Sequence, residues 1–101
     1  MSRYFEWDDH KAELNFRKHG IRFDEAAEVF DDPFALIEQD RVEGGEQRWQ
    51  TIGMTCESLL LLLVAHTVRF EEADDGQAVE VIRIISARRV DRKERRRYEH
   101  R

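Results

Sequence analysis

The chain has 101 residues, of which 41 % are hydrophobic and 39 % are charged, and its formal net charge is −5. This composition predicts one globular domain over residues 1–101, and it excludes a membrane-spanning helix because the longest apolar run, residues 59–65, is far shorter than the roughly 20 residues required. The single cysteine, Cys56, excludes an intramolecular disulfide and a thiolate zinc site, and with no apolar signal region in residues 1–6 it predicts a soluble, cytoplasmic protein.

The N-terminal third of the chain predicts a short β element followed by two helices. Residues 5–7 alternate in polarity, as in a strand or an extended lead-in. Asp8 has the side chain of a helix N-cap and Gly20 stands at the C-terminal cap, so residues 9–19 predict the first helix. An apolar stripe with helical spacing predicts the second helix over residues 24–30.

After residue 33 the apolar pattern changes from helical to strand-like, which predicts a four-stranded antiparallel sheet. The third strand contains the unbroken apolar run, so we expect it at the centre of the sheet with both faces covered. A glycine-containing turn, a tight turn and an acidic loop connect the strands. The strands are predicted over residues 34–39, 48–55, 59–70 and 79–87, and the connections over residues 40–46, 56–57 and 71–77.

The last fourteen residues differ in charge from the rest of the chain. Residues 88–101 carry eight Arg or Lys against three Asp or Glu, whereas residues 1–87 carry nine against nineteen. This segment predicts a terminal basic helix with Val90, Glu94 and Tyr98 toward the sheet. Such a helix binds a polyanion such as RNA or DNA, or it is an exposed helix with i,i+4 ion pairs. The whole pattern is therefore an α+β fold, with helices packed on an antiparallel sheet.

Several polar side chains are candidates for chemistry on a bound phosphate group, which would require a base, an acid and cations for the developing negative charge. Arg69 and Arg83 lie in predicted strands, where an arginine requires a carboxylate or a phosphate partner. His66 interrupts an apolar strand, so it is a base or acid, or a hydrogen-bonded core histidine. The candidate catalytic residues are His66, Arg69, Arg83, Arg88, Glu46 and Tyr98.

The remaining candidates also have structural interpretations. Arg88 is expected at the strand-to-helix junction, where it could reach a phosphate. Glu46 is a base or a solvated turn carboxylate, and Tyr98 stacks on a nucleobase, donates a proton, or packs on the sheet. No Cys/His/Asp cluster has metal-ligand spacing, so we expect neither a metal nor a cofactor. The candidate RNA-binding cations are Lys18, Arg89, Arg92, Arg95 and Arg96.

Short motifs occur in a characteristic order along almost the whole chain. They cover residues 5–8, 15–20, 23–33, 45–48, 51–53, 66–67, 82–88 and 92–98. As an ordered set they resemble the BrnT family of toxins from bacterial type II toxin–antitoxin systems. The resemblance implies a RelE-like ribonuclease fold, RNA cleavage that arrests translation, and a hetero-oligomer with an antitoxin, BrnA, that carries a DNA-binding ribbon-helix-helix region.

Two other classes of function remain open from the sequence. The chain could be a non-enzymatic interaction module whose basic helix docks an acidic partner. It could also bind DNA directly through that helix, although no helix-turn-helix spacing is evident. A neighbouring reading frame that encodes a ribbon-helix-helix protein would favour the toxin.

Overall fold

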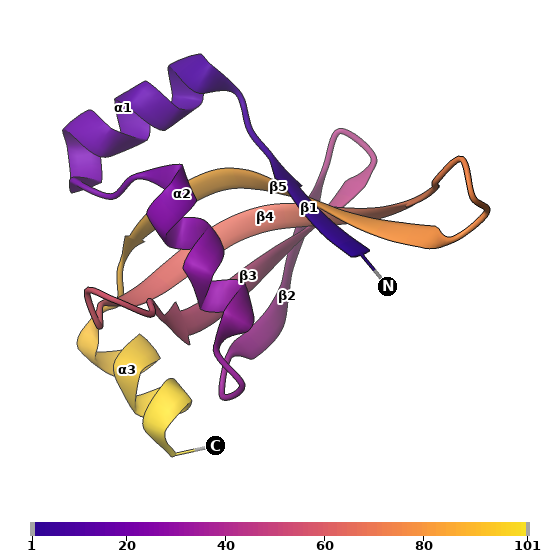
Figure 1. Ribbon diagram of the computed structural model, residues 1–101. Coiled ribbons are helices and arrows are strands. Elements are labelled where there is room, and N and C mark those ends of the chain that lie inside the picture. The colour runs from indigo at the N-terminus through magenta and orange to yellow at the C-terminus, as the bar shows by residue number, and fades with distance from the viewer. Residues whose placement is uncertain (1, 101) are drawn as a thin grey trace.

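In the computed structural model, which describes residues 2–100, three helices and a 3-10 helix pack against a five-stranded sheet (Figure 1). Along the chain these are β1 Ser2–Glu6, α1 Asp9–His19, α2 Phe23–Ala26, the 3-10 helix η1 Ala27–Asp31, β2 Leu36–Glu43, β3 Glu46–Met54, β4 Leu61–Glu72, β5 Ala78–Arg89 and α3 Arg92–Glu99. The strand order is β1-β5-β4-β3-β2. The α+β class is confirmed. No helix among the described residues is long and apolar enough to cross a membrane.

The pairing of β1 corrects the predicted sheet. The sequence predicted four antiparallel strands, but β1 joins them as a fifth strand and runs parallel to β5, with Phe5 beside Ile82. The other neighbours in the sheet are antiparallel. A parallel pair requires a long crossover connection, and here the rest of the sheet and two helices intervene in the sequence. The prediction of a purely antiparallel sheet was therefore wrong.

Helix α1 has the predicted bounds because its caps are strong. The Asp8 carboxylate accepts a hydrogen bond from the Lys11 N–H at 2.9 Å, and Gly20 adopts a left-handed conformation with φ +72°. The second predicted helix is instead split into α2 and η1. Its end is tied to β3 because the Asp32 carboxylate accepts a hydrogen bond from the Met54 N–H at 2.8 Å.

Several strand ends also differ from the predicted ones. The first long strand begins at Leu36, two residues later than predicted, and β2 and β3 continue through the predicted turn, so that only Gly44 and Gly45 separate them. Strands β4 and β5 likewise shorten the acidic loop to residues 73–77. At the C-terminus, β5 continues to Arg89, where backbone pairing with β4 replaces the predicted first turn of helix.

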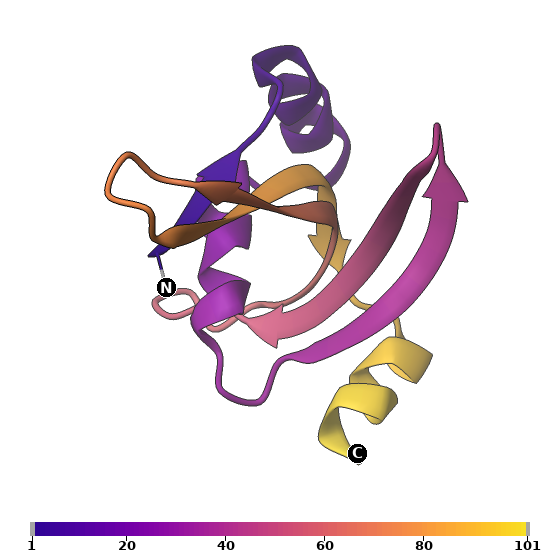
Figure 2. The same ribbon diagram turned by 90° about the vertical axis from the view of Figure 1, so that its right-hand side faces the viewer.

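Strand β4 separates two apolar cores, one on each side of the sheet. The helices lie accordingly, with α1, α2 and η1 on one side of the curved sheet and α3 on the other (Figure 2). Leu62 and Val64 belong to the larger core beneath α1, α2 and η1, whereas Leu61 and Leu63 belong to the smaller core beneath α3. The predicted central strand with both faces covered is therefore confirmed. We call the side that carries α1, α2 and η1 the helix face.

A β-bulge in β5 reverses the alternation of its side chains. In β4, the consecutive residues Ala65 and His66 pair with Ser86 and Ile84, so Ile85 is the extra residue. Ile84 and Ala87 consequently both lie in the core of the helix face. The same shift places Arg83 and Arg88, which flank the bulge, together on the face opposite this core. In a regular strand an odd and an even residue point to opposite faces.

Candidate functional site

Two arginines on the side of the sheet opposite the helix face share one carboxylate. Glu6, at the end of β1, lies beside Arg83 of β5. Arg69 of β4 donates two hydrogen bonds to Glu6, from Nη1 to Oε2 at 2.8 Å and from Nη2 to Oε1 at 2.9 Å, and Arg83 Nη1 donates to Oε2 at 3.0 Å. The hydrogen bond from Arg69 is the largest cause that lowers the pKa of Glu6 to about 2. Glu6 is therefore ionised at neutral pH.

The two arginines differ in the number of donors that they have available. Arg69 uses both terminal nitrogens on Glu6 and also lies 3.4 Å from the Glu71 carboxylate. Within residues 2–100 the Arg83 side chain donates one hydrogen bond, to Glu6, and it is 41 % exposed. The remaining N–H groups of Arg83 can therefore bind a phosphate oxygen in the geometry that a guanidinium favours.

Arg88 lies farther along β5 and contacts α3. Its Nη1 and Nη2 donate to the two carboxylate oxygens of Glu94, each at 2.8 Å. This pairing lowers the pKa of Glu94 and raises that of Arg88. Glu94 also forms a capping box with Asp91 at the start of α3. Arg88 therefore anchors the terminal helix, and a phosphate at this position would compete with Glu94.

The bulge gives this side of the sheet a row of cations. We call it the arginine face, defined by Arg69, Arg83 and Arg88 together with α3, which Arg88 contacts through Glu94. On α3 the Arg97 side chain pairs with Glu38 of β2 at 2.8 Å, which fixes the helix to the far edge of the sheet. Within residues 2–100 no ion pair involves the exposed side chains of the neighbouring cations Arg89, Arg92, Lys93 and Arg96.

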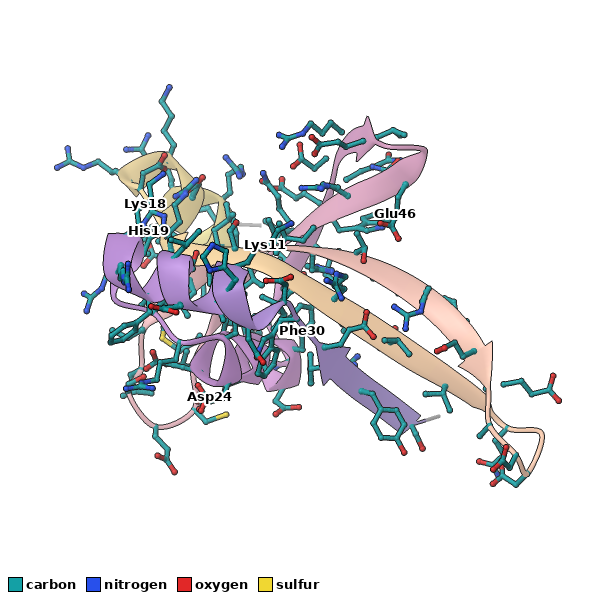
Figure 3. The ribbon with its side chains drawn as sticks, turned by 90° about the horizontal axis from the view of Figure 1, so that it is seen from above. Lys11, Lys18, His19, Asp24, Phe30 and Glu46 are labelled. Carbon is teal, nitrogen blue, oxygen red and sulfur yellow. The ribbon has the colours of Figure 1, made fainter. Side chains whose placement is uncertain are left out.

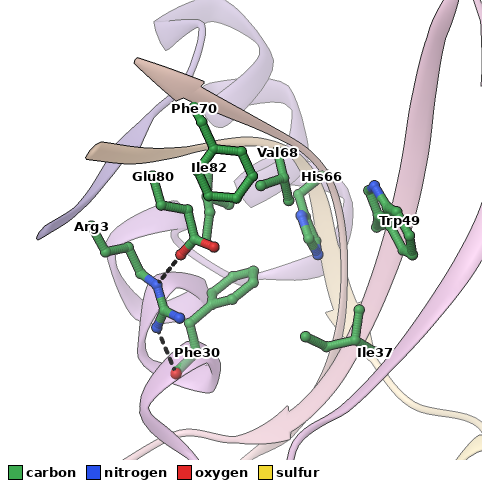
Figure 4. A pocket seen from close by; sticks show the side chains of 9 residues that line it. All are labelled: Arg3, Phe30, Ile37, Trp49, His66, Val68, Phe70, Glu80 and Ile82. Atoms are coloured by element: carbon green, nitrogen blue, oxygen red, sulfur yellow. Dashed lines mark hydrogen bonds and ion pairs between the residues drawn. The ribbon is translucent and has the colours of Figure 1, made fainter. Parts of the chain in front are cut away.

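His66 lies on the helix face, where its ring is next to Phe30 (Figure 4), and therefore on the opposite side of the sheet from these arginines. Its side chain is 1 % exposed, its Nε2 is 2.7 Å from Thr51 Oγ1, and its ring packs edge-on against Phe30 at 4.8 Å. Burial lowers the pKa of His66 to about 4, so the ring is neutral at pH 7. These contacts favour the interpretation of a hydrogen-bonded core histidine.

The other candidates are dispersed. Glu46 is exposed beside the turn between β2 and β3, and Lys18 is exposed on α1, well apart from it in Figure 3. Tyr98 packs against the smaller core, and its hydroxyl donates a hydrogen bond to Asp32 Oδ2 at 2.6 Å. Arg95 of α3 is exposed and lies 3.9 Å from Glu99. The structure thus gathers Arg69, Arg83 and Arg88 on one face, whereas His66 and Lys18 lie on the helix face and Glu46 lies at the β2–β3 turn.

Three residues that organise this region were absent from the sequence-based candidates. Glu6 orients Arg69 and Arg83, and Glu94 orients Arg88. Asn15 binds both backbone groups of Ala87, accepting from its N–H at 3.0 Å and donating to its C=O at 2.9 Å, which fixes α1 against β5. The spacing of Asp91 and Glu94 is a capping-box signal that could have identified Glu94, whereas nothing local indicates the partners of Glu6.

Metal-ligating side chains are dispersed as well. Within residues 2–100 no three His, Cys, Asp or Glu side chains lie close enough together to hold a metal ion.

Comparison with known proteins relates the chain to one family. The family model described as "Ribonuclease toxin, BrnT, of type II toxin-antitoxin system" matches residues 7–94. No curated protein matches the chain. The matched segment contains Arg69, Arg83, Arg88 and Glu94, while Glu6 lies just before it.

Proposed function

The chain belongs to the BrnT family of ribonuclease toxins of type II toxin–antitoxin systems, and from this we propose that it cleaves RNA bound across its arginine face. The observation that carries the proposal is the bulge at Ile85, which places Arg83 and Arg88 on the same side of the sheet as α3. A ribonuclease requires cations at the scissile phosphate and along the flanking backbone. Arg83 has N–H groups without a partner among residues 2–100 for the first, and the exposed cations of α3 serve the second.

The arrangement favours catalysis by electrostatic stabilisation. Arg83, held by Glu6, would donate hydrogen bonds to the phosphorane oxygens, where charge develops in the transition state. Glu6 is ionised and can accept a proton, but a carboxylate with a pKa of about 2 is a weak base. Orientation of the attacking 2′-OH and the charge of the arginines would therefore supply most of the acceleration.

We further propose that residues 1–101 form a single toxin domain and that its antitoxin partner is of the BrnA type, with a ribbon-helix-helix region. The toxin and antitoxin would then form a hetero-oligomer in which the antitoxin supplies DNA binding. Expression of the toxin with and without the neighbouring gene, followed by RNA integrity analysis, tests this assignment. Intact RNA and uninhibited growth in cells that contain folded toxin alone would contradict it.

We expect the purified protein to cleave RNA in excess EDTA. The reason is that the proposed stabilisation of the phosphorane uses guanidinium groups, which do not depend on a divalent ion. The measurement is the cleavage rate before and after chelation, with a metal-dependent nuclease as the control. If chelation abolishes cleavage and one divalent ion restores it, metal-independent cleavage is wrong.

Replacing Arg92, Arg95 and Arg96 together with glutamine is expected to weaken RNA binding. If each contacts a phosphate of single-stranded RNA, the slope of log affinity against log salt concentration should fall by about 0.7 per arginine. Folding should change little, because exposed charges contribute about 0.2–1 kcal/mol each. Titrations with an RNA oligonucleotide at several salt concentrations measure the effect.

A second triple variant provides the control for these titrations. It carries Lys11→Gln, Arg17→Gln and Arg41→Gln, which remove exposed cations of other elements. This control should retain the parental slope. If the α3 variant also retains it, the basic helix does not bind RNA. If the α3 variant instead loses antitoxin affinity alone, the helix is a protein-docking element.

A further inference from the structure

The helix face has an apolar groove that α1, α2 and η1 leave uncovered (Figure 4). The cavity has a volume of about 340 Å³. Phe30, Trp49, Val68 and Ile82 line it, and His66 lies between them. Arg3 lies at one end of the groove. There its guanidinium donates hydrogen bonds to Glu80 Oε1 at 2.6 Å and to the Phe30 carbonyl oxygen at 2.9 Å. The charged groups at this end of the groove, Arg3 and Glu80, are therefore already paired with each other.

Two large apolar side chains at the groove remain in water. Ile37 of β2 is 58 % exposed and Phe70 of β4 is 63 % exposed, and both line the cavity. A lone exposed apolar side chain needs no explanation, but two that line one apolar cavity extend its apolar surface into solvent, as at protein-binding surfaces.

The charge next to this groove indicates the chemistry of the occupant. The segment 71–80, which continues from Phe70, contains five Asp or Glu and no Lys or Arg. Arg3 pairs with Glu80 and Arg69 with Glu71, but within residues 2–100 no cation pairs with Glu72, Asp74 or Asp75. Glu72 also points to the same side as Phe70, because alternate residues of a strand share a face. A complementary segment therefore carries Lys or Arg beside apolar side chains.

We propose that this groove is the anchor site of the antitoxin. The occupant is an amphipathic segment that inserts apolar side chains between Ile37 and Phe70 and lays basic side chains along the hairpin 71–80. This inference rests on the proposed function, since a type II toxin has a protein antitoxin as its partner. The groove and the arginine face lie on opposite sides of the sheet, so the anchor is separate from the RNA-binding surface.

Because the groove and the arginine face are separate, changes to the two surfaces should have different effects. A toxin with an altered groove should keep its ribonuclease activity and escape its antitoxin. By contrast, a change on the arginine face should reduce cleavage and leave the anchoring contacts intact. The two surfaces can therefore be tested independently in the same full-length chain.

The test uses the purified antitoxin encoded next to the toxin gene as the probe, with affinity measured by calorimetry. The double variant Ile37→Ser/Phe70→Ser should bind it at least tenfold more weakly. The variant Glu72→Gln/Asp74→Asn/Asp75→Asn should also bind more weakly, and its association rate should depend less on salt. Val42→Ser, which alters a similarly exposed side chain of β2 outside the groove, is the matched control and should bind like the parent.

Three outcomes separate this inference from the proposed function. Parental affinity in the Ile37→Ser/Phe70→Ser variant overturns the anchor site, provided that its unfolding midpoint matches that of Val42→Ser. If the parent dimerises in sedimentation experiments and the double variant does not, the groove belongs to a second copy of the chain and the proposal is wrong. If the parent fails to cleave RNA, the proposed function fails, while the antitoxin titration still reports on the groove.

Discussion

Replacing Arg83 with alanine is expected to reduce the single-turnover rate of RNA cleavage by about two to three orders of magnitude, the usual cost of losing a donor that stabilises transition-state charge. The free energy of unfolding should change by no more than about 1 kcal/mol, because the pair with Glu6 is partly exposed and the side chain is 41 % exposed. Arg69 would still hold Glu6 through two hydrogen bonds. The measurements are cleavage under single-turnover conditions and urea unfolding of the same preparation.

Two further variants make this result specific. Arg17→Ala removes an exposed arginine that also pairs with one glutamate, Glu13, and it should cleave like the parent. Arg83→Lys keeps the charge but loses the planar array of donors, so it should restore only part of the activity. A rate within threefold of the parent in Arg83→Ala would make Arg83 a structural residue and would remove the central element of the proposed mechanism.

Lowering the pH from 7 to 4 is expected to reduce the free energy of unfolding by up to about 3 kcal/mol through His66. Its pKa is about 4 in the folded chain and 6.5 for an unperturbed histidine, and each unit corresponds to 1.36 kcal/mol. Between these values the unfolded chain binds a proton that the folded chain does not. The contribution is therefore fully present above pH 6.5 and is lost as the pH falls toward 4.

Urea unfolding of the parent and of His66→Gln at several pH values measures this contribution of His66 to the free energy of unfolding. The variant should be less stable at pH 7 and should show a shallower decline between pH 6.5 and 4. The carboxylates Glu6 and Glu94 also lose stabilisation on acidification, but only below their ordinary pKa of 4.5. His10→Gln, at an exposed position on α1, is the control and should decline like the parent. Identical curves for the parent and His66→Gln would show that His66 is not a buried neutral group.

The sequence predicted the features of the fold that depend on neighbouring residues. The caps at Asp8 and Gly20 set the bounds of α1, and the apolar run in β4 correctly placed that strand at the centre of the sheet. The sequence did not predict the features that depend on pairing between residues far apart in the chain. The parallel partner of β1 has no local signal, and the bulge at Ile85 interrupts a pattern that otherwise reads as a regular strand.

The difference between local and distant signals also explains which parts of the candidate site could be predicted from the sequence. Arg69 and Arg83 were recognised because an arginine within an apolar strand requires a partner, but sequence periodicity cannot identify Glu6 as that partner. His66 was recognised for the same reason, yet its face of the sheet and its contact with Thr51 depend on register. The contribution of Arg83 to cleavage is a prediction that Arg83→Ala and Arg83→Lys test, and His66→Gln tests the burial of the neutral histidine.

The parallel pairing of β1 with β5 also constrains when the toxin can become active during synthesis. Glu6 and Arg83 are 77 positions apart in the chain, so their contact is strongly non-local. A nascent chain that has not yet exposed β5 outside the ribosome lacks Arg83 and Arg88, and β1 has no strand to pair with. The arginine face therefore assembles only after the whole segment from Glu6 to Arg88 has been made. A cell with antitoxin already present could bind each toxin molecule as it completes its fold.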